Sequence, residues 1–144
     1  MKQHSPIYST SREAEAAFYH AFETCDISAM MKVWNDDDEI ICIHPMGIRS
    51  VGRASVKNSW LQIFSQDIKL NFKISGQFYF AEKNLAVHLV HENILIGDAT
   101  HFQPPVLATN IYINTKNGWR LAAHHASPSP EPDVRSRAQT EFLH

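Results

Sequence analysis

Apolar residues are spaced as in helices near the start of the chain and as in strands over most of the remainder. Over residues 11–24, apolar side chains such as Phe18 and Phe22 recur every three or four positions, which predicts an amphipathic helix. Thr10 followed three residues later by Glu13 is typical of a capping box at a helix start. We therefore predict a first helix from about residue 11 to residue 24.

Two further helices are predicted before the strand-rich region. Asp26 is suited to capping a short second helix, whose buried stripe would include Met30 and Trp34. The third helix follows a loop that contains Gly47 and Gly52. Its apolar positions have the spacing of one helix face: Val56, Trp60, Ile63 and Phe64.

Strand-like patterns occupy most of the other positions. Residues 39–44 are too short and too β-branched for a helix, and Pro45 prevents further pairing, so a strand ends at His44. Residues 68–80 alternate with a bulge at Ser75 and Gly76, and a second long strand covers residues 85–96. The pattern leaves open which face of the strand 85–96 turns inward, because both are partly apolar.

Residues 108–127 read as a β-hairpin around which the other elements are arranged. Asn117 and Gly118 form the pair that best tolerates positive φ in a tight turn. On the returning strand, alternation from Trp119 places His125 on the apolar face. We therefore expect His125 to point into a pocket and His124 to point outward.

These elements predict an α+β fold. Three N-terminal helices would cover the concave face of a strongly curved, cone-shaped antiparallel sheet. The length of 144 residues fits one domain, which we assign to residues 1–127. Residues 128–144 are proline-rich and are predicted to leave the sheet as a C-terminal arm.

Composition excludes several classes of function. With 13 basic and 15 acidic residues and no basic run, nucleic acid is not an expected partner. No stretch reaches membrane-spanning length or forms a signal peptide, and the two cysteines suit a reducing compartment, so we expect a cytoplasmic protein without membrane contact. Nine histidines are present without metal-ligand spacing, so no metal is predicted.

Several motifs along the chain resemble one known superfamily. They are residues 42–45 (Cys-Ile-His-Pro), Gly52-Arg53, Ser59-Trp60, and the segment from Ala108 through Trp119 to Ser127. Together they resemble the SnoaL-like branch of the nuclear transport factor 2 and ketosteroid isomerase superfamily, over about residues 11–128. The superfamily includes enzymes, ligand binders and transport adaptors, so the resemblance implies the fold and leaves the function open.

The resemblance also implies positions for the site. Steroid isomerases of the superfamily carry their general base as an Asp before a Pro, and His44 stands in the similar position here. Those enzymes hold an oxyanion with a helix-one Tyr, where this chain has Phe18, so steroid isomerisation is not expected. Members commonly dimerise through the outer face of the sheet, and we expect a homodimer here, with Tyr112 and Ala122 on that face.

Two classes of function remain open from the sequence. In one, His44 and His125 are acid/base catalysts of an isomerase, lyase or hydrolase that needs no cofactor. In the other, the chain is a non-catalytic binding or dimerisation module and both histidines are structural. An enzyme or a binding module would hold an apolar small molecule in the cone, whereas a dimerisation module would need none. The expected ligand-binding residues are Phe18, Phe22, Trp34, Trp60, Ile63 and Asn110.

Overall fold

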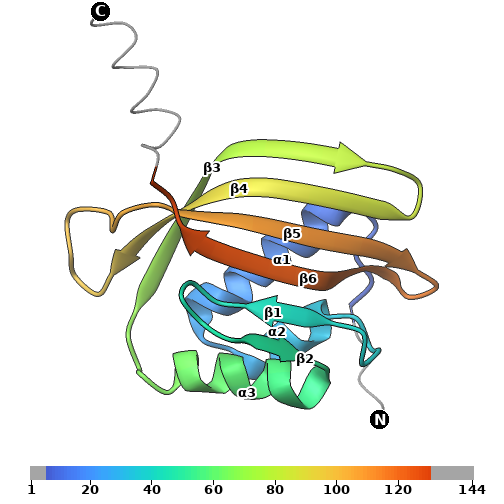
Figure 1. Ribbon diagram of the computed structural model, residues 1–144, viewed down its shortest axis with the longest axis horizontal. Helices are drawn as coiled ribbons and strands as arrows, with labels where there is room; N and C mark the ends of the chain where they lie inside the picture. The colour runs from blue at the N-terminus through green and yellow to red at the C-terminus, as the bar shows by residue number, and fades with distance from the viewer. Residues whose placement is uncertain (1–5, 131–144) are drawn as a thin grey trace, which may run out of the picture.

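The computed structural model describes residues 6–130. Within them, the chain forms three helices and one six-stranded sheet (Figure 1). In chain order they are α1 (Ser11–Thr24), α2 (Ile27–Val33), β1 (Ile41–Ile43), β2 (Arg49–Val51), α3 (Arg53–Phe64), β3 (Leu70–Ala81), β4 (Leu85–Ile96), β5 (Val106–Thr115) and β6 (Gly118–Pro128). Most of the predicted arm, residues 131–144, lies outside the described residues. No described helix has the length and apolar character needed to span a membrane.

The helix starts follow the capping signals in the sequence. The Thr10 hydroxyl accepts a hydrogen bond from the Glu13 amide (3.1 Å), and the Glu13 carboxylate accepts one from the amide of Ser9 (2.7 Å). Asp26 caps α2 by accepting from the amide of Ala29 (3.0 Å). These side chains satisfy amides that have no partner within a helix, so both predicted helix starts are confirmed.

The sheet has the strand order β2-β1-β6-β5-β4-β3. Strands β3 to β6 form an antiparallel meander as predicted, but β1 pairs in parallel with β6, so the sheet is mixed. Strand β2 falls in a segment predicted to be a loop. Its three residues are too few to show the two-residue alternation of a strand. Arg49 and Val51 are both exposed, so no buried apolar position marks the strand in the sequence.

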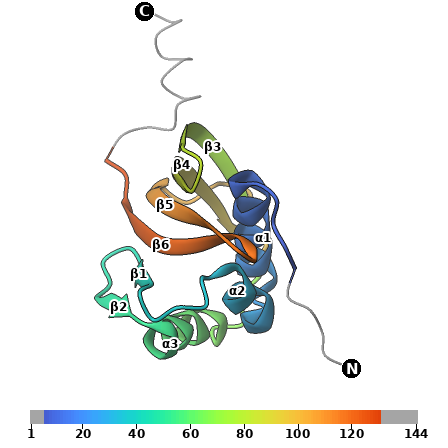
Figure 2. The same ribbon diagram turned by 90° about the vertical axis from the view of Figure 1, so that its right-hand side faces the viewer.

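The sheet is strongly curved, and the helices cover its concave side. Figure 2 shows the strands curling past α1, with α2 and α3 closing the lower side. A register shift between Ser75 and Phe78 marks the predicted bulge in β3, and bulges increase the local bend and twist of a strand. The predicted cone-shaped α+β fold is confirmed.

Aromatic side chains form the core between the concave face and the helices. Phe22 packs against Phe72 of β3 and Trp60 of α3, with ring centroids 4.4 and 4.7 Å apart. On β4 the inward residues are Ala86, His88, Val90 and Glu92, all buried. The structure therefore shows which face of β4 turns inward, a question that the sequence left open. The concave side of this strand therefore carries a carboxyl group and an imidazole among apolar residues.

Candidate functional site

His44 lies directly after β1, at the position where Pro45 ends strand pairing. The ring stands edge-on to the indole of Trp60, with centroids 4.5 Å apart. Its Nε2 is 3.1 Å from the Oγ of Ser59 on α3, and Ser59 donates its hydroxyl hydrogen to the carbonyl of Val56 (2.7 Å). This pattern assigns the hydrogen of His44 to Nε2, which donates to Ser59, and leaves the lone pair of Nδ1 for another partner.

Burial controls the ionisation of the groups around His44. Loss of hydration lowers the pKa of His44 to about 4, so the ring is neutral at physiological pH. Burial also raises the pKa of the neighbouring Cys42 thiol to about 12. Cys42 Sγ lies 3.6 Å from His44 Nε2, but a thiol that stays protonated is a poor nucleophile. Of these two groups, His44 is therefore the one whose form at neutral pH can accept a proton.

Behind His44, four buried side chains from four elements form one hydrogen-bonded chain. His124 Nδ1 of β6 lies 2.6 Å from Asn110 Oδ1 of β5. Asn110 Nδ2 donates to the hydroxyl of Tyr19 on α1 (3.0 Å), which donates to Glu92 Oε2 of β4 (2.6 Å). Because the amide gives its hydrogens to Tyr19, its oxygen accepts from His124, whose hydrogen must be on Nδ1. No described residue hydrogen-bonds to Nε2 of His124.

The environment sets the charges of this chain. Burial, with smaller contributions from His44 and His125, lowers the pKa of His124 to about 3 and keeps the ring neutral. Burial raises the pKa of Glu92 to about 7, although the hydrogen bond from Tyr19 favours the charged form. The His44 and His124 rings lie 6.2 Å apart, both beside Trp60, so two neutral imidazoles face one another in the core.

The expectation that His125 faces the cavity is wrong. His125 is exposed on the convex face, and His124 is buried on the concave face. The register shows why: Tyr112 pairs with Leu121 but Ile111 pairs with Ala123, so β6 contains one extra residue, Ala122. This bulge reverses the alternation of side chains beyond it. Tyr112, expected on the outer face, is likewise buried in the core.

A pocket of about 440 Å³ opens beside His44 between α3 and the β1–β2 hairpin. Ser59 and Ile63 of α3 line it together with Ile48 and Ser50 of the hairpin. The remaining lining residues are mostly hydroxyl and amide side chains: Ser55, Asn58, Gln62 and Gln66, with Gly47. The pocket wall is thus more polar than the predicted apolar cavity.

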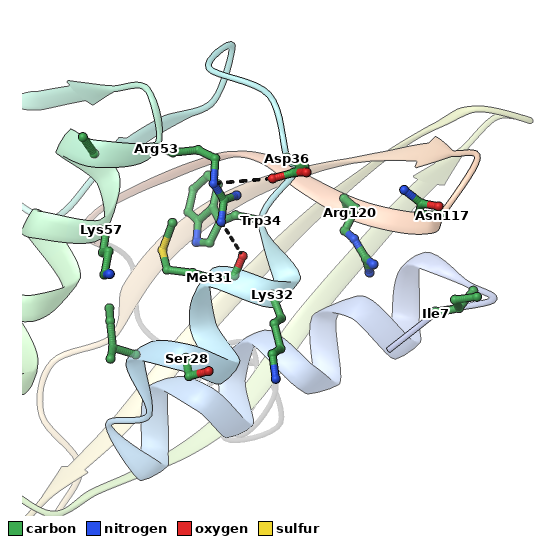
Figure 3. Close-up of a pocket in the computed structure, with 12 residues that line it drawn as sticks. Ile7, Ser28, Met31, Lys32, Trp34, Asp36, Arg53, Lys57, Asn117 and Arg120 are labelled. Carbon is green, nitrogen blue, oxygen red and sulfur yellow. Dashed lines mark hydrogen bonds and ion pairs between the residues drawn. The ribbon is translucent and has the colours of Figure 1, made fainter. Parts of the chain in front are cut away.

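The other residues expected to bind a ligand have different surroundings. Phe18, Phe22 and Trp60 pack on one another within the core, and Phe18 also contacts the His124 ring (5.1 Å between centroids). Trp34 is away from His44, in the wall of a second and larger pocket between α2 and α3 (Figure 3). Among the described residues, no group of three His, Cys, Asp or Glu side chains is arranged to hold a metal ion.

Sequence reasoning missed three polar residues of this site. Tyr19 follows Phe18 and so points about 100° from it around the helix, yet it reaches Glu92 on the facing sheet. Ser59 was noticed only as part of the family resemblance. Glu92 accepts its hydrogen bond from Tyr19 of α1, far away in the sequence. The spacing of polar residues gives no sign of such contacts between distant segments.

Comparison with known proteins identifies the family. The sequence model of the SnoaL-like domain matches residues 12–131. The chain belongs to the SnoaL-like domain family. This SnoaL-like chain is 37% identical to a candidate calcium/calmodulin-dependent protein kinase type II association domain from Thiobacillus denitrificans, with a TM-score of 0.83 over 86% of this chain and 98% of that one. The family and the superfamily fold were therefore predicted correctly.

Two other solved structures are similar to the SnoaL-like chain. A candidate dehydratase of the NTF2-like family from Streptomyces avermitilis is 28% identical, with a TM-score of 0.76 over 84% of this chain and 94% of that one. An NTF2-like protein of unknown function from Pseudomonas putida is 17% identical, with a TM-score of 0.73 over 81% and 82% of the two chains, and shows the fold alone. No curated protein matches the chain.

Proposed function

We propose that this SnoaL-like protein is an enzyme that uses His44 to move a proton on a small molecule bound in the adjoining pocket, without a cofactor. The observation that carries the proposal is the state of His44. The ring lines a pocket, its Nε2 is fixed by Ser59, and its Nδ1 has a lone pair available to a ligand. A neutral imidazole held in this way can act as a general base.

The low pKa of His44 suits a reaction in which the proton is returned. A ring that loses its hydration when buried is a weak base, and its protonated form is a correspondingly strong acid. Once it has taken a proton from a ligand carbon, it can give that proton to a second carbon or to a departing hydroxyl group. These steps belong to an isomerase and a lyase, and a hydrolase would use the same base to activate water.

His124 supports this proposal as a positioning residue. It lies behind His44, and the Asn110-Tyr19-Glu92 chain fixes its hydrogen on Nδ1. A neutral His124 adds no positive charge that would oppose protonation of His44 during turnover. A binding module would need no such arrangement, so the polar groups beside His44 favour an enzyme over a purely apolar binding site.

The ligand class follows from the pocket wall. Four hydroxyl and amide side chains of α3 (Ser55, Asn58, Ser59 and Gln62) face the pocket, and Ile48 and Ile63 add apolar surface to the same wall. Such a wall favours a compact ligand that carries hydroxyl or carbonyl groups over the fully apolar metabolite expected from the sequence. The dehydratase named above, a lyase, is consistent with a ligand of this kind.

The proposal is tested with 5-nitrobenzisoxazole, whose ring opens when a base removes its ring C–H proton. We expect turnover by the wild-type protein that is lost in His44→Gln and kept in the matched control His125→Gln, because His125 is on the opposite face. NMR spectra of both variants would confirm that they fold. Equal turnover by His44→Gln and wild type would contradict the proposal.

We also propose that the protein is a homodimer formed through the convex face. Four large apolar side chains are exposed there: Phe78, Phe80, Leu85 and Leu107. On the same face His91 is nearly buried, and neither ring nitrogen has a hydrogen-bond partner among the described residues. A second copy would cover the apolar side chains.

We also propose a cytoplasmic location, because Cys25 and Cys42 are both free thiols, which suits a reducing compartment.

A further inference from the structure

A second pocket, larger than the one beside His44, lies away from that residue. It has a volume of about 840 Å³ and is lined by α2, the start of α3, Ile7 and the β5–β6 turn (Figure 3). Four cationic side chains line it, namely Lys32, Arg53, Lys57 and Arg120. Asp36 is the one carboxylate in the described wall, and its side chain is 96% exposed. The pocket therefore has an excess of positive charge.

Arg120 is a buried cation without a carboxylate partner. It is only 6% exposed, and its guanidinium donates to the carbonyls of Pro6 (2.8 Å) and Trp119 (3.4 Å), with the Tyr8 ring 5.3 Å away. Within residues 6–130 it forms no ion pair. A guanidinium cannot lose its proton, so burial without a counter-ion is costly unless an anion is bound nearby.

Trp34 provides a second sign of a missing partner. Its side chain is 1% exposed and lines the same pocket, and its indole Nε1 has no hydrogen-bond acceptor in the described part of the chain. Buried polar groups are almost always hydrogen-bonded in folded proteins. A bound molecule with an acceptor group would satisfy this N–H, while Ile7 and Ile27 in the same wall offer apolar surface.

The other three cations of the pocket differ in how freely they can contact a bound anion. Arg53 is held in place, because it donates to the carbonyls of Asn35 (2.7 Å) and Met31 (3.1 Å) and lies 3.8 Å from Asp36. Lys32 and Lys57 form no hydrogen bond or ion pair with the described residues. The two lysines can therefore reach toward an anion without breaking a contact that holds the fold.

We propose that this α2–α3 pocket binds a small organic anion, a carboxylate with an apolar body. The four cations attract the carboxylate, and Ile7 and Ile27 contact the apolar part. The volume is in the range of cavities that hold drug-sized ligands, and it is far larger than a simple inorganic anion requires. The site is separate from the His44 pocket and does not depend on the function proposed for it.

The test uses hexanoate as the probe and hexanamide as its uncharged counterpart. Binding is followed by the NMR signal of the Trp34 indole N–H, which Trp34→Phe identifies by its loss. We expect hexanoate to shift this signal saturably, with hexanamide and acetate binding roughly tenfold more weakly because they lack the charge and the apolar body respectively. No shift up to about 10 mM hexanoate, or equal binding of hexanamide, would overturn the proposal.

Charge variants locate the binding site. The double variant Lys32→Gln/Lys57→Gln should weaken hexanoate binding roughly tenfold, since each exposed ion pair contributes a factor of a few. Neither lysine holds the fold, so this variant avoids the risk that Arg120→Gln disturbs the contact with Pro6. Lys83→Gln, in the exposed β3–β4 turn, is the matched control and should bind as wild type does. Equal affinity of the double variant and wild type would place binding elsewhere and refute the proposal.

Discussion

His124 Nδ1 lies 2.6 Å from Asn110 Oδ1, and both side chains are fully buried between the sheet and α1. This contact links two adjacent strands with a helix, because Asn110 also donates to Tyr19. It fixes the hydrogen of His124 on Nδ1, and it gives the buried amide oxygen of Asn110 a hydrogen-bond donor. The consequences for stability and ionisation can be measured.

Adjacent histidines on β6 should differ sharply in their contribution to stability. His124→Leu leaves the Asn110 oxygen buried without a donor, so we expect the free energy of unfolding to fall by roughly 1 to 3 kcal/mol. His125→Leu replaces an exposed ring and should change it little. Urea unfolding of both variants provides the comparison. Similar losses would contradict the bulge that places the two rings on opposite faces.

The hydrogen position on His124 can be observed by NMR. The wild-type ring should show the Nδ1–H form, with Nε2 carrying the lone pair, over the range where the ring is neutral. Asn110→Leu should lose this preference, whereas Asn114→Leu at an exposed position of the same strand should keep it. Ring nitrogen chemical shifts distinguish the two forms. An Nε2–H form in the wild type would refute the assigned direction of the hydrogen-bonded chain.

The sequence predicts the larger elements well because their signals are local. The residues 11–24 helix begins at its capping box, and β4 begins and ends where its pattern does. The side of the sheet that each histidine faces depends instead on Ala122, the extra residue in β6. A bulge of one small residue between Leu121 and Ala123 leaves no mark in the pattern of apolar and polar positions. Because this extra residue could not be predicted, the sequence pattern places His125 inside and His124 outside, the reverse of what the structure shows.

The functional contacts could be predicted only in part, for a related physical reason. His44 was identified because Pro45 marks the strand end and the family resemblance gives the position. Its partner Ser59 comes from α3, and Tyr19 meets Glu92 across 73 positions of sequence. Such contacts depend on how α1 and α3 are seated on the curved sheet. Local spacing carries no information on that packing.

Stability should depend on pH through three buried groups. His44 and His124 have lowered pKa values, so each favours unfolding as the pH falls below about 6.5, where the unfolded ring is protonated. Glu92 has a raised pKa of about 7 and contributes stability at low pH that is lost as the pH rises toward that value. The two histidines outweigh the carboxyl, so we expect the wild type to be less stable near pH 5 than near pH 7.

Two variants separate these contributions. His44→Gln should lose less stability than the wild type between about pH 7 and pH 5. The unfolded variant lacks one imidazole that would bind a proton in this range and favour unfolding. Glu92→Gln should lose more, because the compensating carboxyl is gone. Urea unfolding at both pH values measures the differences. The same pH dependence in all three proteins would show that these groups titrate normally.

The oligomeric state tests the convex face as an interface. We expect light scattering at micromolar concentration to give about twice the chain mass of 16.4 kDa for the wild type. Phe78→Ser/Phe80→Ser should give the monomer mass, because it removes the two most exposed apolar side chains of that face. Phe102→Ser, at an exposed loop position, is the control and should remain dimeric. A monomeric wild type would refute the interface.

The central claim is that His44 acts as a neutral base in the pocket beside α3. The most direct measurement is the pH dependence of kcat/KM for 5-nitrobenzisoxazole ring opening. We expect a rate that falls on acidification with a midpoint near pH 4, matching the lowered pKa of the free ring, and that is absent in His44→Gln. A midpoint near that of an exposed histidine, or an unchanged profile in His44→Gln, would contradict the account.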